Sequence, residues 1–265
     1  MSDNKEIIIK VELPQLVNDT LKPLASSIGT TLSHGWEGMT VGIETWYGRK
    51  MIDKDLNLKL YKENIEKELS NISEENLQEP KMNILGPAFD ASTYYFEEEQ
   101  YRIMFSKLIA SSCDKSKNSV VHPAFVEFIK QMTPKEAILI SSFKNDFEQP
   151  IANYRFILKD GSGEKDFQTY VFYQNDNEQS SPSENASAII NLERLGFVSI
   201  DFSRYFTHEK HYSKYQNDPF YCAMKHETVT ANQANPNWPY SDLIIQKGIV
   251  KVTPLGKDFI KVCIE

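Results

Sequence analysis

The chain has 265 residues, with 40% hydrophobic and 25% charged residues, which is the composition of an ordinary globular protein with enough chain for a sizeable core. Its formal net charge of −8 argues against general electrostatic binding to nucleic acid, which requires a basic surface. The three cysteines, and the lack of a basic-then-apolar leader in this sequence, predict reduced thiols and a cytoplasmic location.

Residues 1–78 are predicted to form an N-terminal helical arm. A helix is expected after Pro14, and an amphipathic helix is predicted between Leu58 and Ile72, where apolar residues recur at helical spacing. Between these helices, residues 26–48 interleave glycines with large apolar side chains, which predicts a close-packed glycine-rich helical hairpin.

Two alternatives remain open for the glycine-rich stretch. Residues 26–47 could instead act on a membrane, or they could form an interface between copies of the chain. Membrane insertion is disfavoured because Glu37 and Glu44 interrupt the stretch, and an acidic residue costs about 2.5–3.5 kcal/mol at the centre of a bilayer.

Residues 79–132 carry the most regular apolar spacing in the chain, and we interpret them as a central helical scaffold. Apolar residues recur at the three- and four-residue intervals of one helix face. The three predicted stripes consist of Leu85, Ala88, Phe89 and Phe96, of Tyr101, Met104, Phe105, Leu108 and Ile109, and of Phe125, Phe128, Ile129 and Met132.

Residues 133–265 are predicted to form a winged-helix-like domain. Thr133 and Pro134 begin its first helix, because a hydroxyl N-cap followed by proline is a strong helix start. Strands at residues 153–158 and 167–172 form an inserted β-hairpin, and a helix follows over residues 183–195. A long wing then leads to a strand pair that turns at Lys247 and Gly248, and a last helix covers residues 254–263. The predicted fold class is therefore α+β and mostly helical.

Four potential zinc ligands lie close together in the wing, namely His208, His211, Cys222 and His226. Zinc sites favour short paired spacings, but they usually pair cysteines with each other. The tyrosines and phenylalanine between these residues indicate an aromatic packed loop instead, so zinc is the alternative interpretation and no other cofactor is expected.

The remaining titratable residues suggest no catalytic set. The glutamates at 97–99 are expected to offset a helix dipole, and His122 is expected to cap or pack at the start of a helix. Arg204 and His208 lie nearest to the Arg–His pair of helical ribonuclease toxins, but their spacing is too short.

The helix over residues 183–195 would be the recognition helix of a winged helix that reads DNA. It carries Arg194 as its only cation, beside Glu184 and Glu193, and residues 186–265 hold nine basic against eight acidic side chains. Nucleic acid is therefore an unlikely partner, and protein contacts are the better interpretation.

Several motifs in order resemble the abortive-infection alpha family, bacterial phage-defence proteins formerly described as a domain of unknown function. The matching segments are Glu79–Pro80, Asn83–Ala88, Tyr101–Ala110, His122–Val126, Thr133–Ala137, Ile190–Phe197 and Thr253–Phe259. This resemblance implies a role in abortive infection but no particular reaction, since it carries no assigned catalytic residues.

The leading expectation is thus a cytoplasmic anti-phage protein that acts through protein contacts as a sensor, regulator or scaffold. Its partner would be another protein or a phage component, and a homo-oligomer is possible. An RNase-type toxin and a membrane-active effector that uses residues 26–47 are the alternatives, so enzymatic activity stays open, with a protein that is not an enzyme as the favoured interpretation.

Overall fold

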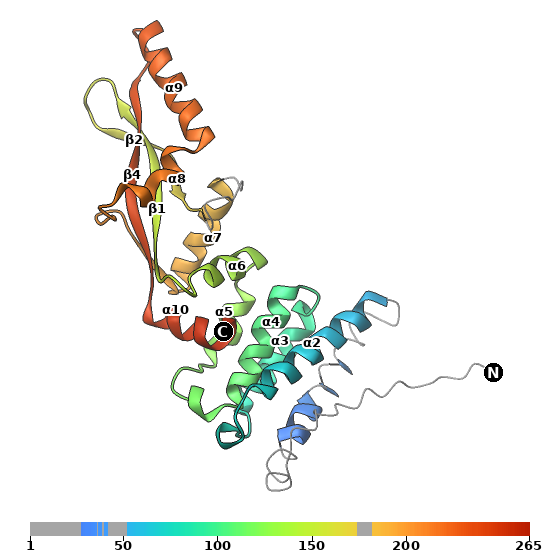
Figure 1. Cartoon of the computed structure of the whole chain (residues 1–265). Coiled ribbons are helices and arrows are strands. Elements are labelled where there is room, and N and C mark those ends of the chain that lie inside the picture. Colours follow the sequence, from blue (N-terminus) through green and yellow to red (C-terminus); the bar gives the residue numbers. More distant parts are fainter. Residues whose placement is uncertain (1–27, 36, 39, 42–51, 174–181) are drawn as a thin grey trace, which may run out of the picture. The chain divides into compact units, whose positions relative to one another are not determined.

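A computed structural model describes residues 28–35, 37, 38, 40, 41, 52–173 and 182–265, which form two compact units (Figure 1). Unit 1 comprises Met1–Pro134 and Asp258–Glu265, and unit 2 comprises Lys135–Lys257. The helix expected after Pro14 and much of the glycine-rich stretch lie outside the described residues. The predicted boundary after residue 78 lies inside unit 1, and the one after residue 132 lies next to the start of unit 2.

Unit 1 is helical and is built around α4. Its elements are α2 (Ile52–Ser70), the short helix η1 (Glu74–Asn76), α3 (Met82–Tyr95), α4 (Glu99–Ser112), the short helix η2 (Lys115–Lys117) and α5 (Ala124–Lys130). Helices α2, α3 and α5 all pack against α4 (Figure 1). The helical spacing predicted for residues 58–72, 85–96, 101–109 and 125–132 is confirmed in these elements.

The predicted apolar stripes form the core of unit 1. Phe105, Leu108 and Ile109 of α4 are fully buried, as are Phe125 and Ile129 of α5. Burying a side chain of this size contributes about 1.5–3 kcal/mol, so these residues of α4 and α5 supply a large part of the apolar stabilisation of the unit.

The end of the chain completes this core. Helix α10 (Pro254–Phe259) continues into a π-helical turn, η4 (Ile260–Ile264), and Phe259 packs edge-on against Phe125 with ring centroids 5.4 Å apart. Ile260, Val262 and Cys263 are at most 1% exposed. The last eight residues therefore belong to the first unit, which corrects their assignment to a domain of residues 133–265.

Unit 2 contains one antiparallel sheet with strand order β2-β1-β4-β3. Its elements are α6 (Pro134–Ser142), β1 (Glu148–Leu158), β2 (Glu164–Val171), α7 (Pro182–Arg194), β3 (Val198–Asp201), the short helix η3 (Glu209–Tyr212), α8 (Ser213–Gln216), α9 (Pro219–Ala234) and β4 (Tyr240–Val252). Helix α9 packs along β4, and α7 packs against β2 and β3 (Figure 1).

The predicted hairpin is confirmed in β1 and β2. Gly161 and Gly163 in its turn have φ values of +75° and +140°, which side chains larger than glycine rarely adopt. The hairpin is not a separate insertion, however, because β1 also pairs with β4 along its whole length. The expectation of an inserted hairpin is corrected accordingly.

The turn predicted at Lys247 and Gly248 is wrong, since both residues lie inside the continuous strand β4 and pair with β1. A Cβ atom at Gly248 would come within 2.6 Å of the Phe202 ring and 3.0 Å of the Asp201 carbonyl oxygen. Glycine is present at this position because another segment approaches the strand closely, which local sequence cannot distinguish from a turn.

The segment expected to be a wing loop is largely helical. Asp218 caps α9 by accepting a hydrogen bond from the Phe220 main-chain nitrogen (3.1 Å), and Pro219 occupies the first turn. This aspartate–proline start is a helix signal in the sequence that the aromatic content obscured.

Tyrosines from this segment form part of one hydrophobic core cluster of unit 2. Tyr212, Tyr215 and Tyr221 pack over Tyr154 and Leu243 of the sheet. Each of the three hydroxyl groups donates to a main-chain oxygen, of Gly248 (2.8 Å), Pro150 (2.6 Å) and Leu243 (3.0 Å) respectively. Buried hydroxyls require such acceptors, so the contacts fix where the segment sits on the sheet. The expectation of an aromatic packed segment is confirmed.

Candidate functional site

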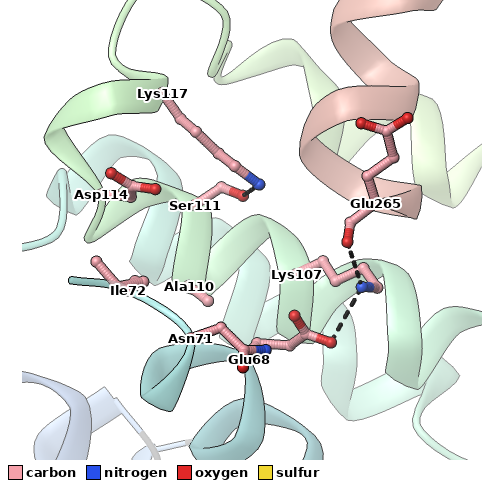
Figure 2. A pocket seen from close by; sticks show the side chains of 9 residues that line it. All are labelled: Glu68, Asn71, Ile72, Lys107, Ala110, Ser111, Asp114, Lys117 and Glu265. Atoms are coloured by element: carbon pink, nitrogen blue, oxygen red, sulfur yellow. Dashed lines mark hydrogen bonds and ion pairs between the residues drawn. The ribbon is translucent and has the colours of Figure 1, made fainter. Parts of the chain in front are cut away.

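The candidate site is a polar pocket in unit 1 with a volume of about 140 Å³. It lies where α2, α4 and η2 end, beside residue 265 (Figure 2). The charged and polar side chains that line it include Glu68, Asn71, Lys107, Ser111, Asp114 and Lys117.

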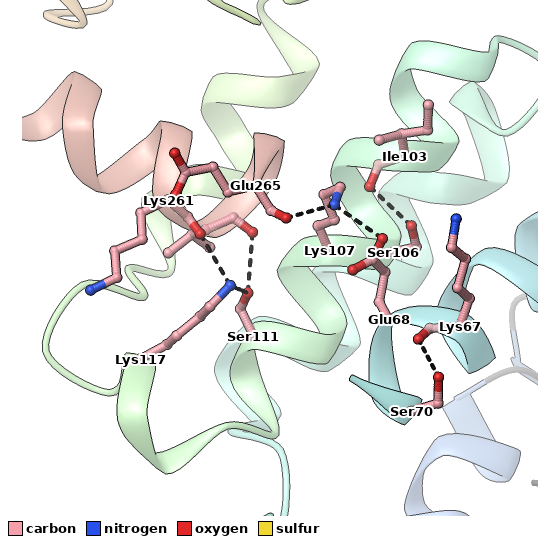
Figure 3. Close-up of polar contacts among 11 residues, drawn as sticks. Lys67, Glu68, Ser70, Ile103, Ser106, Lys107, Ser111, Lys117, Lys261 and Glu265 are labelled. Atoms are coloured by element: carbon pink, nitrogen blue, oxygen red, sulfur yellow. Dashed lines mark hydrogen bonds and ion pairs between the residues drawn. The ribbon is translucent and has the colours of Figure 1, made fainter. Parts of the chain in front are cut away.

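Lys107 of α4 forms one side of the pocket. Its ammonium group pairs with the Glu68 carboxylate at 3.0 Å and donates to the main-chain oxygen of Glu265 at 3.0 Å (Figure 3). The side chains of the ion pair are only 15% and 21% exposed, so the pair is shielded from bulk water more than a surface pair.

Lys117 of η2 forms the other side. Its ammonium group donates to Ser111 Oγ at 3.2 Å and to the main-chain oxygen of Lys261 at 3.1 Å (Figure 3). Ser111 Oγ in turn donates to the main-chain oxygen of Val262 at 3.1 Å. Desolvation of the ammonium group lowers the pKa of Lys117, while the nearby Asp114 carboxylate opposes that shift.

These contacts explain how the end of the chain is held. The last carbonyl groups of a helix have no partners within the helix, and leaving them buried and unpaired is costly. Lys117, Ser111 and Lys107 donate to the carbonyl oxygens of residues 261, 262 and 265, and cations are favourable at the negative end of a helix dipole. The pocket therefore docks η4 onto α4.

The serine–lysine pair has the composition of a nucleophile and its base. In this structure, however, the Ser111 hydroxyl donates its proton to Val262 and accepts from Lys117, so the lysine does not act as a base toward it. The two nearby thiols are also unreactive, since burial raises the pKa of Cys113 to about 12 and raises the pKa of Cys263 as well. The geometry suits binding better than nucleophilic chemistry.

The four potential zinc ligands are distributed over two elements. His208 is the N-cap of η3 and His211 lies within it, with ring centroids 6.3 Å apart, while Cys222 and His226 lie on α9. The His211 ring stacks on Phe206, and Cys222 Sγ donates to the Gln216 carbonyl oxygen. Throughout the described part of the chain, no three His, Cys, Asp or Glu side chains are grouped so as to hold a metal ion.

The other predicted site residues have local roles. His122 Nδ1 accepts from the Ala124 main-chain nitrogen at 3.1 Å and thereby caps α5. Glu98 and Glu99 lie at the start of α4, next to the buried Arg102. Arg204 and His208 are both exposed, and His208 Nδ1 accepts from the Lys210 main-chain nitrogen.

Sequence reasoning missed the pocket because nothing local marks it. Lys107 lies in the predicted helix of residues 101–109 but off its apolar stripe, where a lysine is ordinarily solvated. Its partner Glu265 is 158 residues away, and Lys117 is 144 residues from Lys261. Only tertiary packing brings these groups together.

The described helices bear on the membrane-active alternative. Among the helices of the described ranges, none combines the length and the apolar character that a bilayer span needs. Residues 42–47 of the glycine-rich stretch lie outside those ranges.

Comparison with known proteins identifies the family. The description of the family that matches residues 53–263 is abortive infection alpha. No curated protein matches the sequence. A solved structure of an uncharacterised protein from the hydrocarbon-degrading marine bacterium Alcanivorax borkumensis SK2 shares 14% identity, covers 56% of this chain and 94% of that chain, and has a TM-score of 0.31. Because the family match spans most of the sequence, from α2 to the last helical turn, the chain belongs to the abortive infection alpha family.

Proposed function

We propose that this protein acts in the bacterial cytoplasm in abortive infection, through protein contacts, as a sensor, regulator or scaffold. The observation that carries the proposal is the family match over residues 53–263, which includes most of both units. Its partner is another protein or a phage component.

Exposed apolar side chains on unit 2 support the role of protein contacts. Ile138 of α6 and Ile190 of α7 are each 41% exposed. The two helices are linked by a hydrogen bond from Asn191 Nδ2 to Glu136 Oε1 (3.0 Å). Apolar residues with this exposure beside a partly buried polar contact suit a protein partner better than a polyanion.

The arrangement of unit 2 also supports a winged-helix-like interpretation. The elements that could correspond to that fold are helix α6, strand β1, helix α7, strand β3 and strand β4, with β2 added after β1 and with η3, α8 and α9 between β3 and β4. In this interpretation α7 corresponds to the recognition helix. Its Arg194 Nε donates to Asn191 Oδ1 on the same helix. A single arginine held in this way offers little to a phosphate backbone, so we propose that the module binds protein.

The test is a phage-infection experiment in bacteria that express the full chain. Abortive infection predicts that cells infected at high multiplicity die without releasing phage, whereas cells infected at low multiplicity survive as a population. Plating efficiency and cell survival are measured together across a panel of phages. Normal phage yield with every phage of a broad panel, at normal protein levels, would count against the proposal.

Surface variants test the role of protein contacts. The double variant Ile138→Glu and Ile190→Glu is expected to lose protection while keeping the folded state, because surface changes usually alter stability by less than about 0.5 kcal/mol. Met82→Glu, at a position that is 64% exposed in unit 1, is the matched control. If the wild type, the double variant and Met82→Glu protect equally, the contact with the partner lies on another surface.

A further inference from the structure

Strand β2 forms one edge of the sheet in unit 2. It pairs with β1 alone, and its other side meets no further strand of the described residues. Its first residues, Glu164, Lys165 and Asp166, are exposed. Figure 1 shows the turn between β1 and β2 at the opposite end of the sheet from α7, and Asn185 of α7 donates to the carbonyl oxygen of Phe172, beyond the other end of β2. Helix α7 therefore covers the end of β2 and leaves its beginning open.

The hydrogen-bond pattern shows which main-chain groups of this edge are free. The Leu158 main-chain nitrogen donates to the Gly163 oxygen at 2.9 Å, and the register of β1 and β2 places these two residues opposite each other. Hydrogen-bonded and non-hydrogen-bonded pairs alternate along antiparallel strands. Lys165 therefore directs its N–H and C=O groups toward β1, whereas Glu164 and Asp166 direct theirs away from it. Among the described residues these outward groups have no main-chain partner.

The two faces beside this edge differ in chemistry. Glu164 and Asp166 lie on one face, where their carboxylates pair with Arg155 at 2.7 and 2.8 Å. Two carboxylates share one guanidinium, so one negative charge is left unbalanced, and the Asp166 side chain is 59% exposed. On the other face the Phe167 ring stacks on Phe220 with ring centroids 5.8 Å apart, and Phe220 is 46% exposed. The edge therefore separates an acidic face from an aromatic one.

We propose that the Glu164–Asp166 edge of β2 binds an extended segment of a protein partner in which basic and apolar side chains alternate. In strand addition the main-chain bonds provide affinity and the alternate side chains provide specificity. Residues that bond to the main chain of Glu164 and Asp166 lie directly opposite them on the same face, so these are the basic residues of the partner. The residues between them fall on the face of Phe220 and are apolar. This inference rests on the proposed role in protein contacts and adds the chemistry of the partner.

A second copy of the chain is a poorer occupant of this edge. Two β2 edges paired antiparallel about Lys165 would place Glu164 opposite Asp166, and pairing about either acidic residue would place a carboxylate opposite its own copy. Like charges directly opposite each other destabilise a strand pair, and charged edges guard against pairing between copies in this way. The same carboxylates favour a strand that carries lysine or arginine at those positions.

Binding of a six-residue peptide that alternates lysine with valine tests the proposal on the full chain. We expect saturable binding with half-saturation below about 1 mM, measured by calorimetry. In the free protein the amide of Lys165 should exchange slowly and those of Glu164 and Asp166 quickly, and the peptide should slow the latter two. A peptide that alternates glutamate with valine is the charge control and is expected not to bind.

N-methylated forms of the lysine–valine peptide test the main-chain bonds. Methylation of the lysine nitrogens removes the N–H groups that face the edge and should weaken binding at least about tenfold. Methylation of the valine nitrogens removes N–H groups that face away and should change binding less than about threefold. Equal affinity of the two methylated peptides, equal binding of the glutamate peptide, or no binding up to about 10 mM peptide overturns the proposal.

A proline at the edge provides the matching change in the protein. Asp166→Pro removes an outward N–H without breaking a bond to β1, and it should weaken peptide binding at least about tenfold. Asp166→Asn keeps that N–H and should weaken binding less than about threefold, because an exposed ion pair contributes little. Slow exchange of the Lys165 amide reports that the hairpin of Asp166→Pro is folded. Wild-type affinity in the folded variant overturns the proposal, and if the hairpin unfolds the methylated peptides decide.

Failure of this proposal is distinguishable from failure of the proposed function. A negative result with the peptides removes the β2 edge as a partner surface and leaves the role in abortive infection untouched. Normal phage yield in cells that express the wild-type chain refutes that role, whatever the peptides show.

Discussion

The core of unit 1 is mainly phenylalanine and aliphatic side chains, with Tyr61 and Tyr101 also buried, whereas the cluster that packs against the sheet of unit 2 consists largely of tyrosines. Phe105 and Phe125 have no polar atom to satisfy, and their packing tolerates small shifts of a helix. Tyr212 and Tyr215 must each reach a carbonyl oxygen, of Gly248 and Pro150. Burial of apolar surface stabilises a fold in many orientations, whereas a buried hydrogen bond requires a particular distance and angle. Unit 1 has such directional contacts at Tyr61, which bonds to Ser92 Oγ (2.7 Å), and at Tyr101, which donates to the Met132 main-chain oxygen (2.6 Å). The tyrosine cluster of unit 2 depends on them more heavily.

The largest expected effect tests the apolar core of unit 1. Phe105→Ala should lower the free energy of unfolding by about 3–5 kcal/mol, because Phe105 is fully buried and its loss leaves a cavity. Urea unfolding measures the change, and hydrogen exchange assigns it to unit 1. Leu56→Ala, at a position that is 59% exposed, is the control. A loss below about 1 kcal/mol would contradict the importance of packing at α4.

At alkaline pH the two units should lose stability over different pH ranges. Burial raises the pKa of Tyr154 and of Tyr173 above the usual value near 10, and Asp218 contributes to both shifts. Their stabilising effect is complete below pH 10 and declines above it, because the unfolded state then releases protons that the folded state keeps. The slope is about 1.4 kcal/mol per pH unit for each such tyrosine.

In unit 1 the corresponding decline should begin earlier, near pH 9, because burial raises the pKa of Cys113 to about 12 and also raises the pKa of Cys263. The lowered pKa of Lys117 acts in the opposite direction, and the pKa of Tyr61, which burial raises, adds to the decline above pH 10. Hydrogen exchange between pH 8 and 11, corrected for intrinsic rates, follows both units. A simultaneous loss of both units would refute this difference.

A single hydroxyl tests the directional contacts of unit 2. Tyr212→Phe should destabilise unit 2 by about 1–2 kcal/mol, because the Gly248 carbonyl oxygen and the Phe206 main-chain nitrogen both lose a partner. Tyr205→Phe is the matched control, since Tyr205 is 56% exposed. If chemical denaturation gives equal stabilities for the two variants, the hydrogen bonds of the tyrosine core contribute nothing measurable.

The smallest expected effect concerns metal. We expect elemental analysis of the purified protein to find no zinc, and we expect EDTA to leave the melting temperature of unit 2 unchanged. Stoichiometric zinc that disappears in His211→Ala would show that unit 2 is held by a metal site as well as by tyrosines. The comparison between the units would then need revision.

Local pattern was sufficient for the helices of unit 1 and for the hairpin of unit 2. The stripe from Tyr101 to Ile109 faces inward because helical geometry places those residues on one side, whatever lies opposite. Gly161 and Gly163 marked the hairpin turn because few other residues adopt their backbone conformations. Gly248 carried the same signal for a different reason, since the Phe202 ring occupies the space of its side chain.

The sequence by itself determined the helical periods, the hairpin and the family, because each depends on residues close together in the chain or on the order of motifs. Tertiary structure alone decided that residues 258–265 complete unit 1, and that Lys107 and Lys117 meet carbonyl groups more than 140 residues away. It also decided which acceptors the tyrosine hydroxyls reach. Such contacts depend on how segments distant in the sequence pack together, and the spacing of neighbouring residues does not predict that packing.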